Sequence, residues 1–228
     1  MSAGTSQVDR DIALMARYWG ERKAYWRDCA AEEFEGFVRP RAMHEEVPDF
    51  DILCMVNMGF TEWVLFERPL HNGRTPLQLY IGRAPDCIGS DAVERLRQVE
   101  RTHVFSRFAI LDKDRDSGMA ILRDTRSDCV YDVHDPVLCQ RNRWRDGTIA
   151  ERIACVDDVW QAVGQTRLYD RALPQFTSED GPGELHDEDR GIPGIDEAGF
   201  FLRFLRDVMG EEGRYASTLR SVKLSGAA

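Results

Sequence analysis

The chain has 228 residues, of which 43% are hydrophobic and 31% charged, and its formal net charge is −10 at pH 7. This length allows one large domain or two small ones, and the composition is that of a globular protein and not of a disordered one. The negative charge is spread along the chain, which disfavours proteins that bind nucleic acids by neutralising phosphates.

No stretch approaches the roughly 18 consecutive apolar residues of a membrane-spanning helix, and residues 1–10 lack the pattern of a signal peptide. We therefore predict a cytoplasmic protein without a membrane partner. The cysteines are widely spaced and form no C-x-x-C pair, which is typical of reduced thiols that act as small hydrophobic groups. We expect neither a metal nor a cofactor. The alternative is a zinc site built from Cys129, His134 and Cys139.

The N-terminal part of the chain predicts helices. Apolar residues at helical spacing predict one long amphipathic helix over 8–31. A second helical stretch is expected from Phe50 to Phe66, and Gly59 is a candidate break within it.

Two further helices are expected before residue 104. Thr75, Pro76 and Gln78 supply a capping hydroxyl, a proline at the first helical position and an amide three residues after the cap, which together predict a helix start. Another helix is expected over 90–103. His103 lies on its apolar face, which is typical of a hydrogen-bonded core histidine.

From Val104 the hydrophobic period changes from helical spacing to two, which predicts β-strands. Five short strands joined mainly by tight turns are expected within 104–163. Closing or curling such a sheet removes its exposed edges. The sequence therefore predicts an α+β protein with a five-stranded, SH3/OB-like antiparallel barrel or curled sheet.

The C-terminal part begins with an acidic segment, Thr177 to Gly194, whose Gly, Pro, Asp and Glu content predicts a solvated linker. A helix with a broad apolar stripe is expected over 195–209. We expect this stripe to pack on the body of the protein, and docking onto a second subunit is the alternative. The predicted division is a helical region (1–103), a small β-barrel (104–170), an acidic linker (171–194), and a C-terminal helix and tail (195–228).

The segment from about Phe60 to Gly164 resembles uncharacterised bacterial proteins related to those that carry a SEC-C zinc motif. The likeness depends on Trp63–Arg68, on Gly73–Leu77 with Tyr80, on the first three predicted strands, and on Asp146-Gly147. It implies a helical part followed by a small barrel. The SEC-C metal-binding tail is rich in cysteine, and residues 210–228 contain none, so the resemblance does not extend to zinc.

The basic and aromatic cluster of the chain is formed by Arg141, Arg143, Trp144 and Arg145. On an OB-like barrel such a loop can stack a base and hold a phosphate. The alternative is a structural loop whose tryptophan caps the barrel. We take these four residues as the candidate binding site.

Two other polar groups are candidates for chemistry. His44, Glu45 and nearby acidic residues place imidazole and carboxylates close in sequence, as does His134 with Asp135 at a strand end, although neighbours in sequence need not converge in space. The series Asp112, Asp114 and Asp116 is similar to the start of a calcium loop but lacks its glycine and glutamate positions, which favours a solvated hairpin turn.

The sequence contains no G-x-S-x-G, phosphate-loop, dinucleotide or H-E-x-x-H motif. We therefore expect a non-catalytic binding or regulatory module that acts through the barrel and its 141–145 loop. We expect its partner to be a macromolecule, and a protein is favoured over a nucleic acid. A homo-oligomer formed through helix 195–209 is a further alternative. The competing hypothesis is an enzyme, of hydrolase type, that uses His44, Glu45 and His134.

Overall fold

The computed structural model describes residues 6–170 and 179–215. In these residues the chain is α+β, with seven α-helices and five β-strands. The helices are α1 (Gln7–Gly20), α2 (Arg27–Val38), α3 (Phe50–Phe66), α4 (Pro76–Gly82), α5 (Ser90–Thr102), α6 (Pro136–Gln140) and α7 (Phe200–Met209). The strands are β1 (Val104–Lys113), β2 (Met119–Asp124), β3 (Val130–His134), β4 (Thr148–Val156) and β5 (Val159–Asp170).

The five strands form one mixed sheet whose pairings return to their starting point, in the order β1-β2-β3-β5-β4. Four of the pairings are antiparallel. The prediction of a purely antiparallel sheet is wrong, because β3 and β5 run parallel and pair Val133 with Trp160 and His134 with Gln161. This pairing joins strands that are distant in sequence, so no turn between neighbouring strands could have indicated it.

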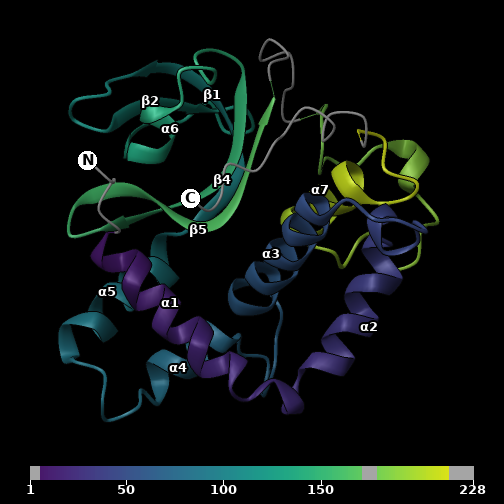
Figure 1. Ribbon diagram of the computed structural model, residues 1–228, viewed down its shortest axis with the longest axis horizontal. Coiled ribbons are helices and arrows are strands. Elements are labelled where there is room, and N and C mark those ends of the chain that lie inside the picture. Colours follow the sequence, from purple (N-terminus) through teal and green to yellow (C-terminus); the bar gives the residue numbers. More distant parts are fainter. Residues whose placement is uncertain (1–5, 171–178, 216–228) are drawn as a thin grey trace.

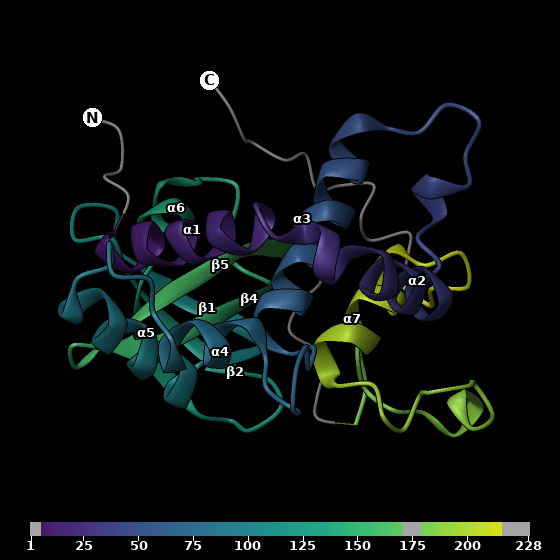
Figure 2. The same ribbon diagram turned by 90° about the horizontal axis from the view of Figure 1, so that it is seen from below.

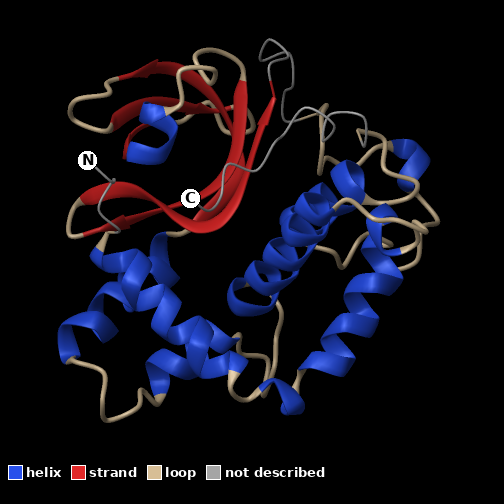
Figure 3. Ribbon diagram, viewed as in Figure 1, coloured by secondary structure: helices blue, strands red, loops and turns tan. Residues whose placement is uncertain are grey.

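The helices lie on two sides of the sheet, in two groups (Figure 1). The first group is α1, α4 and α5, and α1 lies across β5 (Figure 2). The second group is α2, α3 and α7, which pack on one another beside β1 and β5. The short helix α6 lies in the opening of the ring of strands (Figure 3), where its Leu138 and Cys139 join the hydrophobic interior of the sheet.

The expected helix over 8–31 is divided in two. Helix α1 ends at Gly20, a 3₁₀ turn spans Lys23–Tyr25, and α2 begins at Arg27. The indole of Trp26 donates to the Trp19 carbonyl oxygen at 3.1 Å, which holds the bend. The division lets α1 pack in the first group while Phe34 and Val38 of α2 join the second group.

The predictions for α3, α4 and α5 fit the structure, whereas the helix expected over 195–209 begins only at Phe200 and the short helix α6 was not predicted. Helix α3 is continuous through Gly59, where an added Cβ would lie 3.1 Å from the Leu205 side chain, so glycine here permits close approach of α7. Thr75 and Gln78 form the expected capping box at the start of α4. His103 is a hydrogen-bonded histidine as predicted, because its Nδ1 lies 3.0 Å from the Arg152 guanidinium.

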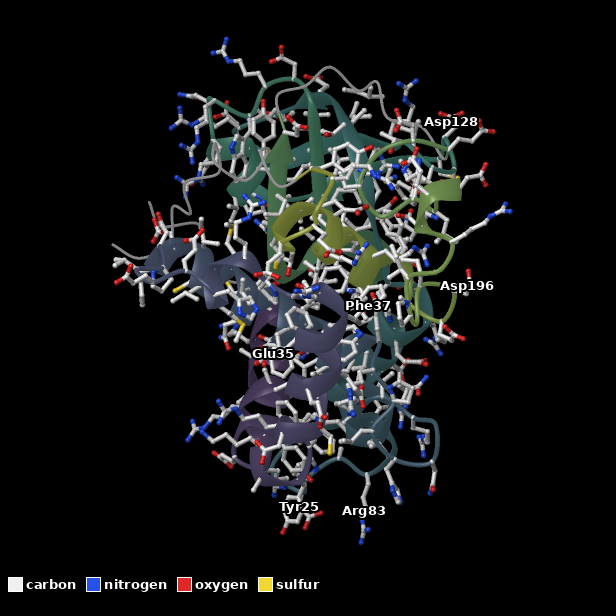
Figure 4. All side chains as sticks on the ribbon, turned by 90° about the vertical axis from the view of Figure 1, so that its right-hand side faces the viewer. Tyr25, Glu35, Phe37, Arg83, Asp128 and Asp196 are labelled. Atoms are coloured by element: carbon white, nitrogen blue, oxygen red, sulfur yellow. The ribbon has the colours of Figure 1, made fainter. Side chains whose placement is uncertain are left out.

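The acidic segment before α7 is solvated only in part where the structure describes it, because most of 185–194 is exposed but the stretch before it is not. Residues 181–184 are buried, and the Glu184 carboxylate accepts from Arg107 at 2.8 Å and from Arg126 at 2.7 Å. Asp128 and Asp196 lie on the same side of the molecule (Figure 4). Acidic composition predicted solvation, but arginines on and beside β1 neutralise the segment. Residues 171–178 of the predicted linker and the tail 216–228 lie outside the described residues.

The apolar stripe of the C-terminal helix packs on the body of the protein, as expected. Phe201, Phe204 and Leu205 are buried in a core shared with α2, α3 and Phe105 of β1. The chain itself therefore covers the apolar stripe that the alternative prediction assigned to a second subunit.

Candidate functional site: a polar pocket between the helices and the sheet

A pocket of about 630 Å³ lies where α1 and α3 meet β5 and the end of β3. Its lining residues come from four segments that are far apart in sequence. They are Ser6, Asp9, Ile12, Ala13 and Ala16 from the α1 region, Asn57, Met58, Thr61, Glu62, Leu65 and Phe66 from α3, His134–Val137, and Gln161, Ala162, Gly164, Gln165 and Arg167 from β5.

Glu62 fixes the wall of the pocket on the β5 side. One carboxylate oxygen accepts from the backbone N–H groups of Gln165 at 3.1 Å and Thr166 at 2.9 Å, and the other accepts from Arg152 Nε at 2.8 Å. Gly164 has a φ of +87°, and a Cβ at this position would lie 2.9 Å from the Glu62 carboxylate. Only glycine fits this approach without displacement, so the strand is shaped around the carboxylate.

Arg152 connects Glu62 to a second carboxylate and to an imidazole. The arginine side chain is 1% exposed, and it donates to Glu67 at 2.7 Å in addition to Glu62. Burial, and secondarily the Arg152 charge, lowers the pKa of His103 to about 4. His103 is therefore neutral at physiological pH, and its ring nitrogen can accept the hydrogen bond from Arg152.

A second buried charge cluster lies at the pocket where the end of β3 meets β5. Asp135 caps α6, and its Oδ1 accepts from the backbone N–H groups of Val137 at 3.0 Å and Leu138 at 3.1 Å, and from Arg167 Nη1 at 3.0 Å. Both carboxyl oxygens of Glu151, and Oδ2 of Asp135, are buried without a hydrogen-bond partner among the described residues. The Arg167 Nε lies 3.8 Å from Glu151.

The protonation state of Glu151 explains these unpaired oxygens. Burial raises the pKa of Glu151 well above its ordinary value, the Asp135 carboxylate adds to this rise, and Arg167 opposes it. A raised pKa favours the protonated form of Glu151, and a protonated carboxyl group would supply the donor that Asp135 Oδ2 otherwise lacks. The two acids and Arg167 together then carry no net charge.

The predicted binding loop over 141–145 is divided between surface and interior. Arg143 and Arg145 are exposed and Arg141 is partly buried, but Trp144 is 8% exposed and stacks on Tyr169, with ring centroids 5.4 Å apart. A tryptophan in this position caps the interior of the sheet and is not accessible to a base. The burial of Trp144 favours the alternative of a structural cap, and the binding role of the four residues stays a prediction.

The residues proposed for enzymatic chemistry do not all converge. His134 lines the pocket, whereas His44 and Glu45 lie exposed in the loop before α3. Among the described residues, no group of three or more His, Cys, Asp or Glu side chains is placed to hold a metal ion, so the alternative zinc site is not assembled there. Asp114 in the β1–β2 turn accepts from Asp116 N and Ser117 Oγ, as a solvated hairpin turn does.

Sequence reasoning missed Glu62, Glu151, Arg152 and Arg167. A signal was present: Glu151 lies between Ile149 and Ile153, at a position where alternation places an inward-facing side chain. A charge at such a position is unusual and marks a candidate site. Glu62 gave a comparable signal, because it is the one charged residue between Asp51 and Glu67 in a mainly apolar helix.

Within the part of the chain that is described, no helix has the length and apolar character to cross a bilayer. No family model matches the chain. Neither the curated proteins nor the solved structures contain a significant match to it. The resemblance of the central segment to SEC-C-related proteins stays a prediction.

Proposed function

We propose that the protein is a non-catalytic binding module whose ligand is a small organic molecule held in the pocket between α1, α3 and the closed sheet. The observation that carries the proposal is the pocket itself, whose volume of about 630 Å³ falls in the range of small-molecule sites. Its lining combines apolar side chains with a few polar groups, which is typical of such sites.

The arrangement of the strands supports an SH3/OB-like barrel as the scaffold of this module. The five strands pair in a closed order, and the short helix α6 connects β3 to β4. We assign ligand binding to the pocket and not to the predicted 141–145 loop, because Trp144 of that loop is buried.

The rigidity of the walls also supports a binding role. Glu62 and Asp135 each accept three hydrogen bonds from the protein, and these bonds hold β5 and α6 in place before any ligand arrives. A site whose polar groups are fixed in advance loses less conformational entropy on binding.

The proposal is tested by ligand-observed NMR with a set of small carboxylates, alcohols and amines, using wild-type protein and two variants of α1. Ala13→Phe places a large ring at a lining position, whereas Leu14→Phe changes the adjacent residue, which is 47% exposed and does not line the pocket. We expect compounds that bind wild type and Leu14→Phe to lose binding to Ala13→Phe. Equal binding to both variants, or no binding to wild type, would refute the proposal.

A second candidate function is a hydrolytic enzyme, and one observation favours it: His134 and Asp135 line the same pocket. Hydrolysis of p-nitrophenyl hexanoate by the wild-type protein, lost in His134→Gln and kept in His44→Gln, would favour this candidate over the binding module. Binding without turnover favours the module.

A further inference from the structure

The carboxylates that line the pocket are already engaged with the protein. Glu62 and Asp135 accept three hydrogen bonds each, and Asp9 accepts from the backbone N–H of Ser6 at the start of α1. Asp135 has no exposed surface, and Glu62 is 3% exposed. These acids therefore shape the pocket but present little acceptor capacity to a ligand.

Arg167 differs from the acids because part of its donor capacity is unused. Among the described residues that line the pocket, it is the one arginine or lysine. Its Nη1 donates to Asp135 and its Nε faces Glu151, whereas its Nη2 has no partner in the described part of the chain. The side chain keeps 19% of its surface exposed.

Further uncommitted donors line the same pocket. Gln165 is two residues before Arg167 on β5, and Gln161, Asn57 and Thr61 also line the pocket. Their side chains make no hydrogen bond within the described residues, and Asn57 and Gln165 are exposed. Amide and hydroxyl groups can donate to an anion, but one fixed guanidinium sets the sign of the charge that fits best.

The rest of the pocket is apolar. Ile12, Ala13 and Ala16 of α1 face it from one side, and Met58, Leu65 and Phe66 of α3 line it from another. Water expelled from such surfaces favours the binding of an aliphatic or aromatic body.

We propose that the ligand is a small monocarboxylate, with its carboxylate on Arg167 and its apolar body between α1 and α3. This inference rests on the proposed binding function and deepens it. A single negative charge fits because one charged donor, Arg167 Nη2, is left uncommitted among the described lining residues. A second negative group would meet Asp9, Glu62 and Asp135 without a cation of its own.

The test compares three probes of equal chain length, hexanoate, hexan-1-ol and hexylamine, titrated into the full chain at pH 7 and followed by NMR. A charge-assisted hydrogen bond is about twice as strong as a neutral one, so hexanoate should bind about tenfold more tightly than the alcohol. Hexylamine should bind most weakly. The preference for hexanoate should disappear in Arg167→Gln and persist in Arg123→Gln, a control at an exposed arginine of β2 that does not line the pocket.

Each outcome decides one of the two proposals. If the alcohol or amine binds as tightly as hexanoate, and Ala13→Phe blocks them all, the monocarboxylate inference fails and the binding function stands. If none of the probes binds wild type, the inference fails, and the wider compound set with Ala13→Phe decides the function separately. If Arg167→Gln does not fold, Arg167→Met replaces it as a second uncharged variant, and a hexanoate preference unchanged in Arg167→Met would overturn the inference.

Discussion

Substituting Glu151→Gln tests whether a proton is held between the two buried acids. The side chain is 1% exposed, and glutamine has nearly the same shape. Its amide can still donate to Asp135, but it cannot ionise. The substitution therefore removes the titration while it keeps the hydrogen bond.

The sign of the effect follows from the raised pKa of Glu151. An acid whose folded-state pKa lies above its ordinary value of 4.5 keeps its proton in the folded chain while the unfolded chain loses it. The stability that this group contributes is complete below pH 4.5 and declines as pH rises toward the folded pKa. The decline is about 1.4 kcal/mol for each pH unit within that window.

Urea unfolding at pH 5, 6 and 7 measures this slope. Relative to Glu151→Gln, the wild-type protein should lose about 1.4 kcal/mol of unfolding free energy per pH unit until the folded pKa is reached. Taking the difference between the two proteins cancels His103 and other titrating groups. Glu197→Gln, at an exposed position, is the matched control and should follow wild type. If wild type and Glu151→Gln give parallel curves, Glu151 is ionised in the folded state and the shared proton does not exist.

Three further substitutions test the interior of the protein by urea unfolding. His103→Gln should reduce the loss of stability that wild type shows below pH 6.5. Because the pKa of His103 is about 4 in the folded protein, wild type should lose about 1.4 kcal/mol of unfolding free energy per pH unit as pH falls from 6.5 to 4. Equal pH dependence in both proteins would contradict a buried neutral imidazole. Gly164→Ala should lower the unfolding free energy by at least about 1–3 kcal/mol, because the position has a positive φ and a Cβ there would meet the Glu62 carboxylate. Gly36→Ala, at an unobstructed position in α2, should be neutral or stabilising. Equal effects of the two substitutions would refute the close approach of Gly164 to Glu62. Glu184→Gln should cost about 3–5 kcal/mol because it removes a buried carboxylate that both Arg107 and Arg126 contact, whereas Glu188→Gln, 85% exposed, should cost at most about 1 kcal/mol. A small effect at Glu184 would contradict a buried ion pair at this carboxylate.

Local pattern was sufficient to predict most elements of the fold. Two-residue alternation from Val104 onward indicated every strand, since each strand has one face in the hydrophobic interior. The capping residues at Thr75 likewise fixed a helix start without tertiary information. Alternation cannot specify which strands become neighbours, and the parallel pairing of β3 with β5 was therefore missed.

Breaks in helices were harder to predict than their existence. The periodicity of 8–31 is nearly continuous, yet the chain bends near Trp26 because α1 and α2 pack in different hydrophobic cores. The gain from burying both apolar faces outweighs the few hydrogen bonds lost at the bend. Such a choice depends on tertiary packing and has no local signature.

The site illustrates the same limit in charged residues. Asp135 and Arg167 are 32 positions apart and meet only because β5 runs beside β3. A sequence pattern identifies charged residues that are clustered along the chain. It therefore favoured the arginines clustered within 141–145 as the binding site. The arginines that form buried ion pairs, Arg107 and Arg152, lie among mainly apolar residues of their strands and belong to no motif.

The presence of the buried acids supports the binding proposal on energetic grounds. Buried ion pairs often stabilise a fold no better than apolar side chains of similar volume, because the cost of desolvating the charges offsets their attraction. Folding alone therefore does not require Arg167, Asp135 and Glu151 at one end of a sheet whose interior is otherwise apolar. A charged group kept next to a pocket is explained if a ligand uses it, and Arg167 retains a donor for that purpose. By the same reasoning, replacing Glu151 can stabilise the protein, whereas replacing Arg167 should remove the ligand preference.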